Sequence, residues 1–354
     1  MLFSEYAYSF DPSSNRDVSR ASTKPKATPR SSTLQDLVIK LASSDLSDLS
    51  SNNRLLPSIG SQLGNGATFQ VERREAMGEK LVAVKHIQRD IMGGGQYSYT
   101  ALTRERLEDV FREVRVLLHL NSLQHPSVVE LLGYGWDQGP LPYLVLELAD
   151  LGSLDNFLQE NLLSWSQKEL TMVQLASGLE MLHACEIIHG DIKLENILVF
   201  SEPPHGFIAK LADFGFCLSD TLGAEVYHGT RVLNAPEIRY HNKKYALKSK
   251  PEMADVYSYG LAVWEIANDG RRFYSASPIG IDAQDVDKAL WFLSEMDLAD
   301  QEILTYAIEF VASLSLPKTL ASQFTAILRM ALQRDPQSRS GIREIRQVMD
   351  PEER

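Results

Sequence analysis

The sequence predicts an α+β fold with two lobes: a small antiparallel β lobe that carries one helix, and a larger, mainly helical lobe. Three observations support this division. Strand-like runs cluster between residues 55 and 88, an amphipathic run follows them, and from "GSLDNFL" onward the pattern is chiefly helical. The boundary falls near Ala149. With 354 residues, of which 44% are hydrophobic, the chain is long enough to bury a substantial core.

The chain opens with a Ser-, Thr- and Pro-rich segment, residues 1–53, whose composition predicts disorder. Inside it, "TLQDLVIKLASSDLSDL" places Leu34, Leu37, Val38 and Leu41 at helical spacing. Such a helix could dock on the folded part of the chain or on a partner, and a transient helix without a role is the alternative. We assign residues 54–148 to the small lobe and 149–350 to the large lobe.

The small lobe begins with three strand candidates, "LLPSIGSQLG", "ATFQVERRE" and "KLVAVKHIQ", in which β-branched residues alternate. After a Gly-rich interruption, "RLEDVFREVRVLLHL" has the periodicity of an amphipathic helix. The face that we expect to be buried consists of Leu107, Val110, Phe111, Val114, Leu117 and Leu118. Two further strand candidates, "VVELLGYGWD" and "PYLVLELA", complete this lobe.

Composition excludes several classes of function. The formal net charge of -12 argues against broad capture of nucleic acid or of an anionic membrane. No apolar run is long enough to span a bilayer, and the first residues lack the basic region of a secretory signal. Because Cys185 and Cys217 are the only cysteines, a disulfide framework is not expected. We therefore expect an intracellular, cytoplasmic protein.

The first motif is "GNGATFQV", from Gly64 to Val71, which alone is as typical of a hairpin turn as of a phosphate-binding loop. Lys85 follows in "VAVK", on the strand expected to pair beside it. Glu113, on the amphipathic helix, could turn inward to pair with Lys85. Taken singly, each charge could instead be an ordinary surface residue.

The second motif is "IIHGDIKLENILVF", a polar excursion between a helical run and a strand candidate. It places Asp191 and Asn196 on a loop held by rigid elements. Asp213, in "LADFGF", lies on a second acidic loop after another strand. Oxygen ligands from Asn196 and Asp213 would suit a hard cation such as Mg²⁺, which leaves Asp191 for another role. Capping of helices and turns is the alternative for each residue.

With these motifs in this order, the chain resembles the eukaryotic protein kinases from about Leu55 to Met349. The matching motifs are "GNGATFQV", "VAVK", the helix glutamate, "HGDIKLEN", "DFG" and "NAPE". The resemblance implies the bilobal protein kinase fold, with ATP and Mg²⁺ bound between the lobes, and a protein substrate with a Ser or Thr hydroxyl.

The resemblance also implies a role for each matched residue. Asp191 would orient or accept the proton of the substrate hydroxyl, and Lys193 would neutralise charge on the transferred group. Lys85, braced by Glu113, would contact the nucleotide phosphates, and Asn196 and Asp213 would hold the metal. The remaining nucleotide-binding positions would be Gly64, Asn65, Gly66, Val71, Ala83, Glu147, Ala149 and Leu198, with Leu146 gating the pocket behind the adenine. Structural roles would fall to His189, Phe214, Leu117, Asp255, Glu237 and Arg339.

Two positions depart from the pattern of the family. Phe69 replaces the third glycine of the Gly-rich loop, and Gly190 replaces the arginine that commonly receives a phosphate from the activation segment. We therefore expect activity that does not strictly require phosphorylation. The candidate phosphorylation sites are Ser219, Thr221, Tyr227 and Thr230.

Lys193 and Thr230 are typical of kinases that act on Ser and Thr, and "DVYSYGLAVWEI" is closest to the tyrosine-kinase-like group, whose members are mostly Ser/Thr-specific. The favoured interpretation is an active Ser/Thr protein kinase. The alternative is a pseudokinase that binds nucleotide and serves as a scaffold, which Phe69 and Gly190 favour. A small-molecule kinase is a third possibility, against which the "NAPE" segment argues.

Overall fold

The structure is a computed structural model that describes residues 34–49, 62–65, 69–76, 80–87, 90–91, 97–98, 104–121, 123–136, 142–202, 206–219, 229–239, 250–276, 278–298 and 302–349. Within these residues the predicted fold class is confirmed, because a lobe built on a β-sheet precedes a mainly helical lobe. Most of the first expected strand, residues 55–61, and the Gly-rich loop at 66–68 lie outside the described residues.

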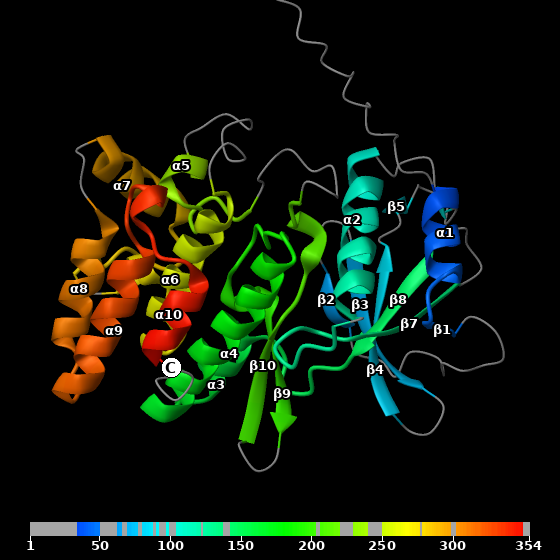
Figure 1. Ribbon diagram of the computed structural model, residues 1–354, viewed down its shortest axis with the longest axis horizontal. Coiled ribbons are helices and arrows are strands. Elements are labelled where there is room, and N and C mark those ends of the chain that lie inside the picture. The colour runs from blue at the N-terminus through cyan, green and yellow to red at the C-terminus, as the bar shows by residue number, and fades with distance from the viewer. Residues whose placement is uncertain are drawn as a thin grey trace, which may run out of the picture. The chain divides into compact units, whose positions relative to one another are not determined.

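The small lobe is built on a six-stranded sheet with the order β1-β7-β8-β4-β3-β2 (Figure 1). Its strands are β1 (Ser47–Asp48), β2 (Gln62–Asn65), β3 (Phe69–Ala76), β4 (Lys80–Ile87), β7 (Leu131–Trp136) and β8 (Pro142–Glu147). Neighbouring strands are antiparallel except for β1, which pairs with β7 in parallel. A separate antiparallel pair consists of β5 (Asp90–Ile91) and β6 (Tyr97–Ser98).

The amphipathic run forms α2 (Arg104–Asn121), which packs against the sheet. Val110, Phe111, Val114 and Leu117 are buried as the periodicity predicts, and Leu118 is partly buried. Val116 is also fully buried, although it falls outside the predicted apolar face. The reason is that α2 is covered on two sides.

The second cover comes from residues 34–49. Here the structure has the docked helix that the apolar spacing left open, and not the disorder that composition predicted for residues 1–53. This segment forms α1 (Leu34–Ala42) and β1, and it buries Leu37 and Leu41 in the same apolar core as α2. Ser47 pairs with Gly133 of β7, where a Cβ would lie 2.6 Å from the Ser47 carbonyl oxygen. Composition alone could not reveal this, because the apolar stripe of α1 is stabilised by α2, a tertiary contact.

The large lobe contains most of the helices of the described chain (Figure 1). They are α3 (Leu154–Glu160), α4 (Trp165–Ala184), α5 (Pro236–Arg239), α6 (Glu252–Ala267), α7 (Val286–Leu298), α8 (Ile303–Ser313), α9 (Lys318–Ala331) and α10 (Ile342–Met349), with the hairpin β9 (Ile197–Glu202) and β10 (Gly206–Leu211). Every residue of α6 from Met253 to Ala267 is buried, so this helix forms the centre of the lobe.

Local sequence explains where α4 begins. Ser164 accepts a hydrogen bond from the Gln167 backbone N–H, and the Gln167 side chain accepts one from the Ser164 N–H, which is a complete capping box. α4 then runs to Ala184, directly before the predicted catalytic loop. No helix among those the structure describes is both long enough and apolar enough to cross a membrane.

The packing of α1 predicts a stability effect. Leu41 is completely buried, so Leu41→Ala should lower the free energy of unfolding by about 2–5 kcal/mol through lost burial and a cavity. Ile39, on the same helix, is 58% exposed, so Ile39→Ala should change it by only about 0.5 kcal/mol. Urea titration of both variants measures the difference, and equal small effects would show that α1 does not pack on the lobe.

Candidate active site

The ammonium of Lys85 on β4 lies between two carboxylates from distant parts of the chain. Lys85 Nζ donates hydrogen bonds to Glu113 Oε1 on α2 at 2.5 Å and to Asp213 Oδ1, just after β10, at 3.2 Å. The side chains of Lys85 and Glu113 are 9% and 2% exposed, whereas that of Asp213 is 44% exposed. Three residues that the sequence predicted separately are thus brought together.

These contacts determine the charges. Burial by itself would lower the pKa of Lys85, but the carboxylates of Asp213 and Glu113 outweigh it and raise that pKa above its ordinary value. The Lys85 ammonium in turn lowers the pKa of Asp213, against the opposing effect of burial. At neutral pH the site therefore holds a charged ammonium and a charged carboxylate that faces solvent.

Phe69 closes another side of the Lys85 site. β3 begins at Phe69, whose side chain is buried and whose ring centroid lies 4.2 Å from Lys85 Nζ. The face of an aromatic ring attracts a cation. The residue that replaces the expected third glycine is therefore packed onto the ammonium. Gly64 and Asn65 lie on β2, and Gly66 lies outside the described residues.

The carboxylate of Asp191 is fixed by four donors. Its Oδ1 accepts hydrogen bonds from the Thr230 N–H and the Thr230 hydroxyl, both at 2.7 Å. Its Oδ2 accepts one from Asn196 Nδ2 at 2.9 Å and lies 2.6 Å from Lys193 Nζ. Lys193 also donates to the Thr230 hydroxyl at 3.0 Å. Asp191, Lys193 and Thr230 therefore form one network around a buried carboxylate.

The orientation of Asn196 can be deduced from its partners. Its Nδ2 donates to both the backbone oxygen and Oδ2 of Asp191, each at 2.9 Å. Both partners are acceptors, so the amide carbonyl oxygen must be the other atom, turned away from Asp191. The backbone of Asn196 also accepts a hydrogen bond from the Ala212 N–H at 2.9 Å, next to Asp213.

An amide oxygen and an ionised carboxylate on adjacent segments fit the ligand preference of Mg²⁺. Within the described ranges no group of three or more His, Cys, Asp or Glu side chains is arranged to hold a metal ion.

Asp255 of α6 anchors the segment that carries Asp191. Its fully buried carboxylate accepts hydrogen bonds from the backbone N–H groups of His189 at 2.7 Å and Gly190 at 2.9 Å. His183 Nε2 lies 3.1 Å from the same carboxylate. Hydrogen bonds to a carboxylate are among the stronger hydrogen bonds in proteins, so Asp255 fixes the backbone of this loop to α6.

His189 joins the two acidic loops. Its Nε2 donates to the Ala212 oxygen at 3.0 Å, and its ring lies 5.4 Å from that of Phe214, centroid to centroid. Phe214 and Leu117 of α2 are both fully buried in the same core. Arg112 Nη1, also on α2, donates to the Gly215 oxygen at 2.7 Å. These contacts hold α2 against the loop that carries Asp213.

Gly190 has a left-handed backbone with φ of +80°, a conformation that favours glycine. A Cβ at this position would lie 2.5 Å from the backbone oxygen of Phe216, too close for any side chain without movement of the chain. The glycine is therefore required by the local geometry. An arginine could not be accommodated here unless the Phe216 backbone moved.

Two expected adenine-contacting residues lie on the strands of the sheet. In the register, Val71 is opposite Lys85, and Ala83 is opposite Leu146. Ala83 and Leu146 are buried and belong to the same core. Val71 and Ala83 thus lie near Lys85 on β3 and β4.

The connection between the lobes contains the other expected positions. The Glu147 N–H donates to the Glu130 oxygen at 3.1 Å, so it is already used within the sheet. The Ala149 oxygen accepts from the Gly152 N–H at 3.2 Å, and Leu198 of β9 forms a bridge with Ser153. β9 is thereby tied to the segment that follows β8.

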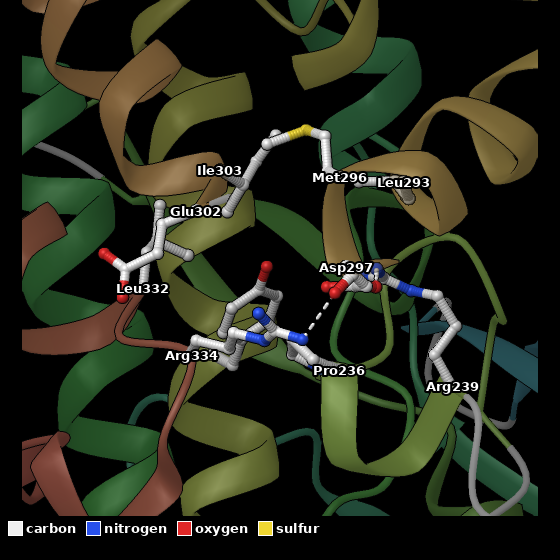
Figure 2. Close-up of a pocket in the computed structure, with 10 residues that line it drawn as sticks. Pro236, Arg239, Leu293, Met296, Asp297, Glu302, Ile303, Leu332 and Arg334 are labelled. Atoms are coloured by element: carbon white, nitrogen blue, oxygen red, sulfur yellow. Dashed lines mark hydrogen bonds and ion pairs between the residues drawn. The ribbon is translucent and has the colours of Figure 1, made fainter. Parts of the chain in front are cut away.

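In the large lobe, Glu237 of α5 forms a bidentate ion pair with Arg339, whose Nη1 and Nη2 donate at 2.6 and 2.8 Å. A small cavity lies nearby (Figure 2). It is lined by Arg239 and Arg334, which donate to the Asp297 side chain at 3.2 Å and to its backbone oxygen at 2.7 Å. Its volume of about 10 Å³ is room for one water molecule, so we regard it as a structural void.

The geometry defines the class of protein, and comparison with known sequences agrees. Residues 58–349 match the protein kinase domain model, so the chain belongs to the protein kinase family. Chains similar to this one include a mouse megakaryocyte-associated tyrosine-protein kinase, 31% identical over 61% of this chain and 37% of its own length. Another is mitogen-activated protein kinase kinase kinase 1a of Physcomitrium patens, 32% identical over 60% of this chain and 26% of its own length.

A third relative is the probable serine/threonine-protein kinase PBL6 of Arabidopsis thaliana, 34% identical over 49% of this chain and 41% of its own length. The aligned regions therefore span well under two thirds of these relatives. Names for both tyrosine and serine/threonine kinases occur at similar identity. The comparisons thus define the family without defining which hydroxyl is phosphorylated.

Sequence reasoning missed two contacts in this site. In the sequence, Thr230 is only a feature typical of the Ser/Thr class, and its direct hydrogen bonds to Asp191 and Lys193 are seen only in the structure. Arg112 was not singled out at all, although it binds the Gly215 oxygen. The only hint in the sequence was that Arg112 directly precedes Glu113 on the helix. Adjacent helix residues point to different neighbours, so Arg112 had to contact a different part of the chain than Glu113 does.

The backbone at Gly190 yields a prediction with a matched control. Gly280 also has a positive φ, +65°, but a Cβ there would meet nothing within 4 Å. Gly280→Ala should therefore cost only the backbone strain, about 1–2 kcal/mol. Gly190→Ala should lower the free energy of unfolding by at least about 1 kcal/mol more, because the new methyl group meets the Phe216 backbone. Equal losses in chemical denaturation would contradict this account.

Proposed function

We propose that this chain is a serine/threonine protein kinase that transfers the γ-phosphoryl group of ATP to a protein hydroxyl. The observation that supports this best is the Asp191 network, in which one carboxylate is oriented by Thr230, Asn196 and Lys193. A second support is the assembled pair of Lys85 and Glu113 next to Asp213. A chain without phosphoryl transfer has no physical use for the complete set.

In the proposed reaction, the substrate hydroxyl oxygen forms a bond to the γ-phosphorus while the bond from that phosphorus to the β,γ-bridging oxygen breaks. Asp191 accepts or orients the hydroxyl proton, and the leaving group departs as ADP. Lys193, 2.6 Å from Asp191 Oδ2, stabilises negative charge on the transferred group. The tight hydrogen bonding of Asp191 fixes where the hydroxyl must lie.

We assign nucleotide binding to the groups around Lys85. Its ammonium, held by Glu113, would contact the α- and β-phosphates, and Asn196 and Asp213 would hold Mg²⁺, which would neutralise phosphate charge. Backbone N–H groups of Gly64, Asn65 and Gly66 would approach the phosphates.

The adenine would lie between Val71, Ala83 and Leu198. Because the Glu147 N–H is used by Glu130, the hydrogen bonds to the adenine would use the Glu147 carbonyl and the Ala149 N–H.

We infer specificity for Ser and Thr from the bridge that Thr230 forms between Asp191 and Lys193. This bridge places a cation beside the carboxylate, where the short side chain of a Ser or Thr substrate would present its hydroxyl. We also propose an intracellular location, because Cys185 and Cys217 are both free thiols.

The first test is phosphate transfer from labelled ATP with Mg²⁺ to a generic protein substrate. Asp191→Asn should lower turnover by about 10²–10⁴-fold, the usual contribution of a positioned base. The same variant should still bind Mg²⁺ and ATP, measured by thermal shift, because Asp191 is not a proposed ligand of either. Equal trace activity in the two proteins, with nucleotide binding intact, would favour the pseudokinase alternative.

The second test concerns the activation segment. The absence of an arginine at Gly190 motivates our expectation that Thr221→Ala and Tyr227→Phe retain most of the turnover. Thr230 differs, because its hydroxyl binds both Asp191 and Lys193. Thr230→Ala should lower turnover roughly tenfold or more, and Thr230→Ser, which keeps the hydroxyl, should restore it. Loss of turnover in the Thr221 and Tyr227 variants with nucleotide binding intact would overturn the expectation.

A further inference from the structure

The ammonium of Lys85 is in contact with two carboxylates and one aromatic ring. Its Nζ donates hydrogen bonds to Glu113 Oε1 and Asp213 Oδ1, and the ring centroid of Phe69 lies 4.2 Å from it. An ammonium has three N–H donors, and the two carboxylates use two of them. Only 9% of the Lys85 side chain is exposed, so little of its surface is open to a further ligand.

The strand register explains why Phe69 reaches Lys85. Val71 is opposite Lys85, and Phe69 lies two residues before Val71 on β3. Side chains two residues apart on a strand point to the same face of the sheet, so Phe69, Val71 and Lys85 share one face. A diagonal neighbour on the next strand is within reach of an aromatic side chain. Phe69 therefore lies on the face that the proposed function assigns to the nucleotide.

The ring is the weakest of the three partners of Lys85. Hydrogen bonds between an ammonium and a carboxylate are charge-assisted, whereas the ring attracts the cation only through its quadrupole. Phe69 is buried in the apolar core, so it covers its side of the ammonium with a surface that cannot bind an anion. A phosphate oxygen gains most by replacing the ring, because the ionic bonds to Glu113 and Asp213 are then kept.

We propose that Phe69 is a displaceable cover of Lys85, whose ring must leave the ammonium before the phosphates of a nucleotide can bind there. This inference rests on the function proposed above, because it takes Lys85 as the residue that contacts the phosphates. Its consequence is that Phe69 lowers the affinity for nucleotides and not for nucleosides. The glycine that the family pattern has at this position could not act in this way, because it has no side chain.

The experiment compares ADP in the presence of Mg²⁺ with adenosine, by isothermal titration calorimetry on the full chain. Phe69→Leu keeps an apolar side chain but loses the attraction of the ring for the cation, so it should bind ADP roughly fivefold more tightly. Phe69→Ala removes more of the cover and should bind ADP at least as tightly as Phe69→Leu. Adenosine has no phosphate, so both variants should bind it with the affinity of the unchanged chain.

Phe324→Leu is the matched control. Phe324 is a buried phenylalanine of α9 in the large lobe, so this variant removes the same ring from another part of the core. It should leave the ADP affinity unchanged, which separates the effect of the ring beside Lys85 from a general loss of packing.

A second measurement follows the ring itself. In the chain labelled with para-fluorophenylalanine, the fluorine resonance that is absent from the Phe69→Leu protein belongs to residue 69. Saturating ADP with Mg²⁺ should shift this resonance, because the ring leaves the ammonium. Saturating adenosine should leave it in place.

Equal ADP affinity in the unchanged chain and both Phe69 variants, or an unshifted resonance with ADP bound, would overturn the proposal and leave the proposed function intact. The phosphates would then replace Asp213 on Lys85 while the ring stays. An equal gain in adenosine affinity would also overturn it, because Phe69 would then act on the whole pocket. Failure of every protein to bind either ligand would contradict the proposed function and this inference together. If Phe69→Ala does not fold, Phe69→Leu and the fluorine resonance still decide.

Discussion

The constraint on which the structure depends is the buried ammonium of Lys85. An ammonium removed from water is costly unless it is paired, and its two carboxylate partners, Glu113 and Asp213, are 100 residues apart in the sequence. α2 must therefore lie against the sheet, and the loop after β10 must approach from the other lobe. The contacts between Phe214 and His189, and between Arg112 and Gly215, are additional connections that maintain this arrangement.

In the large lobe, the buried carboxylate of Asp255 has a comparable role for the loop that carries Asp191. This carboxylate lies on a helix with no exposed side, and it binds two successive backbone N–H groups of the loop that carries Asp191. Because the backbone is fixed there, Thr230, Asn196 and Lys193 can hold the Asp191 carboxylate in one orientation. Lys85 is thus supported from the sheet, and Asp191 from α6.

Much of this arrangement could be predicted from the sequence. The periodicity of the run around Glu113 predicted α2, and the order of the motifs predicted the family and the residues near Lys85. For residues 34–49 the sequence left two interpretations open, disorder from the composition and a docked helix from the apolar spacing. It could not decide between them, because a short apolar stripe in a polar segment depends on a partner surface for its stability. It did not predict the second buried side of α2 at Val116 for the same reason.

The local geometry of Gly190 also could not be read from the sequence. A missing arginine suggested only a lost phosphate-binding group, whereas the left-handed backbone and the nearby Phe216 oxygen are properties of the folded chain. Likewise, the sequence presents Thr230 only as a residue typical of Ser/Thr kinases. The contacts of its hydroxyl with Asp191 and Lys193 depend on the folding of segments that are distant in the sequence.

The parallel pairing of β1 with β7 shows that the folded unit of this chain starts before the segment that matches the family model. The family model begins at residue 58, but the sheet acquires its edge strand from Ser47 and Asp48, and the back of α2 is covered from residue 34 onward. A polypeptide trimmed to residues 58–349 would leave an unprotected strand edge at β7 and an open apolar surface on α2, both of which promote self-association. In this chain the compact unit begins at Ser32, well before residue 58, where the match to the family model begins.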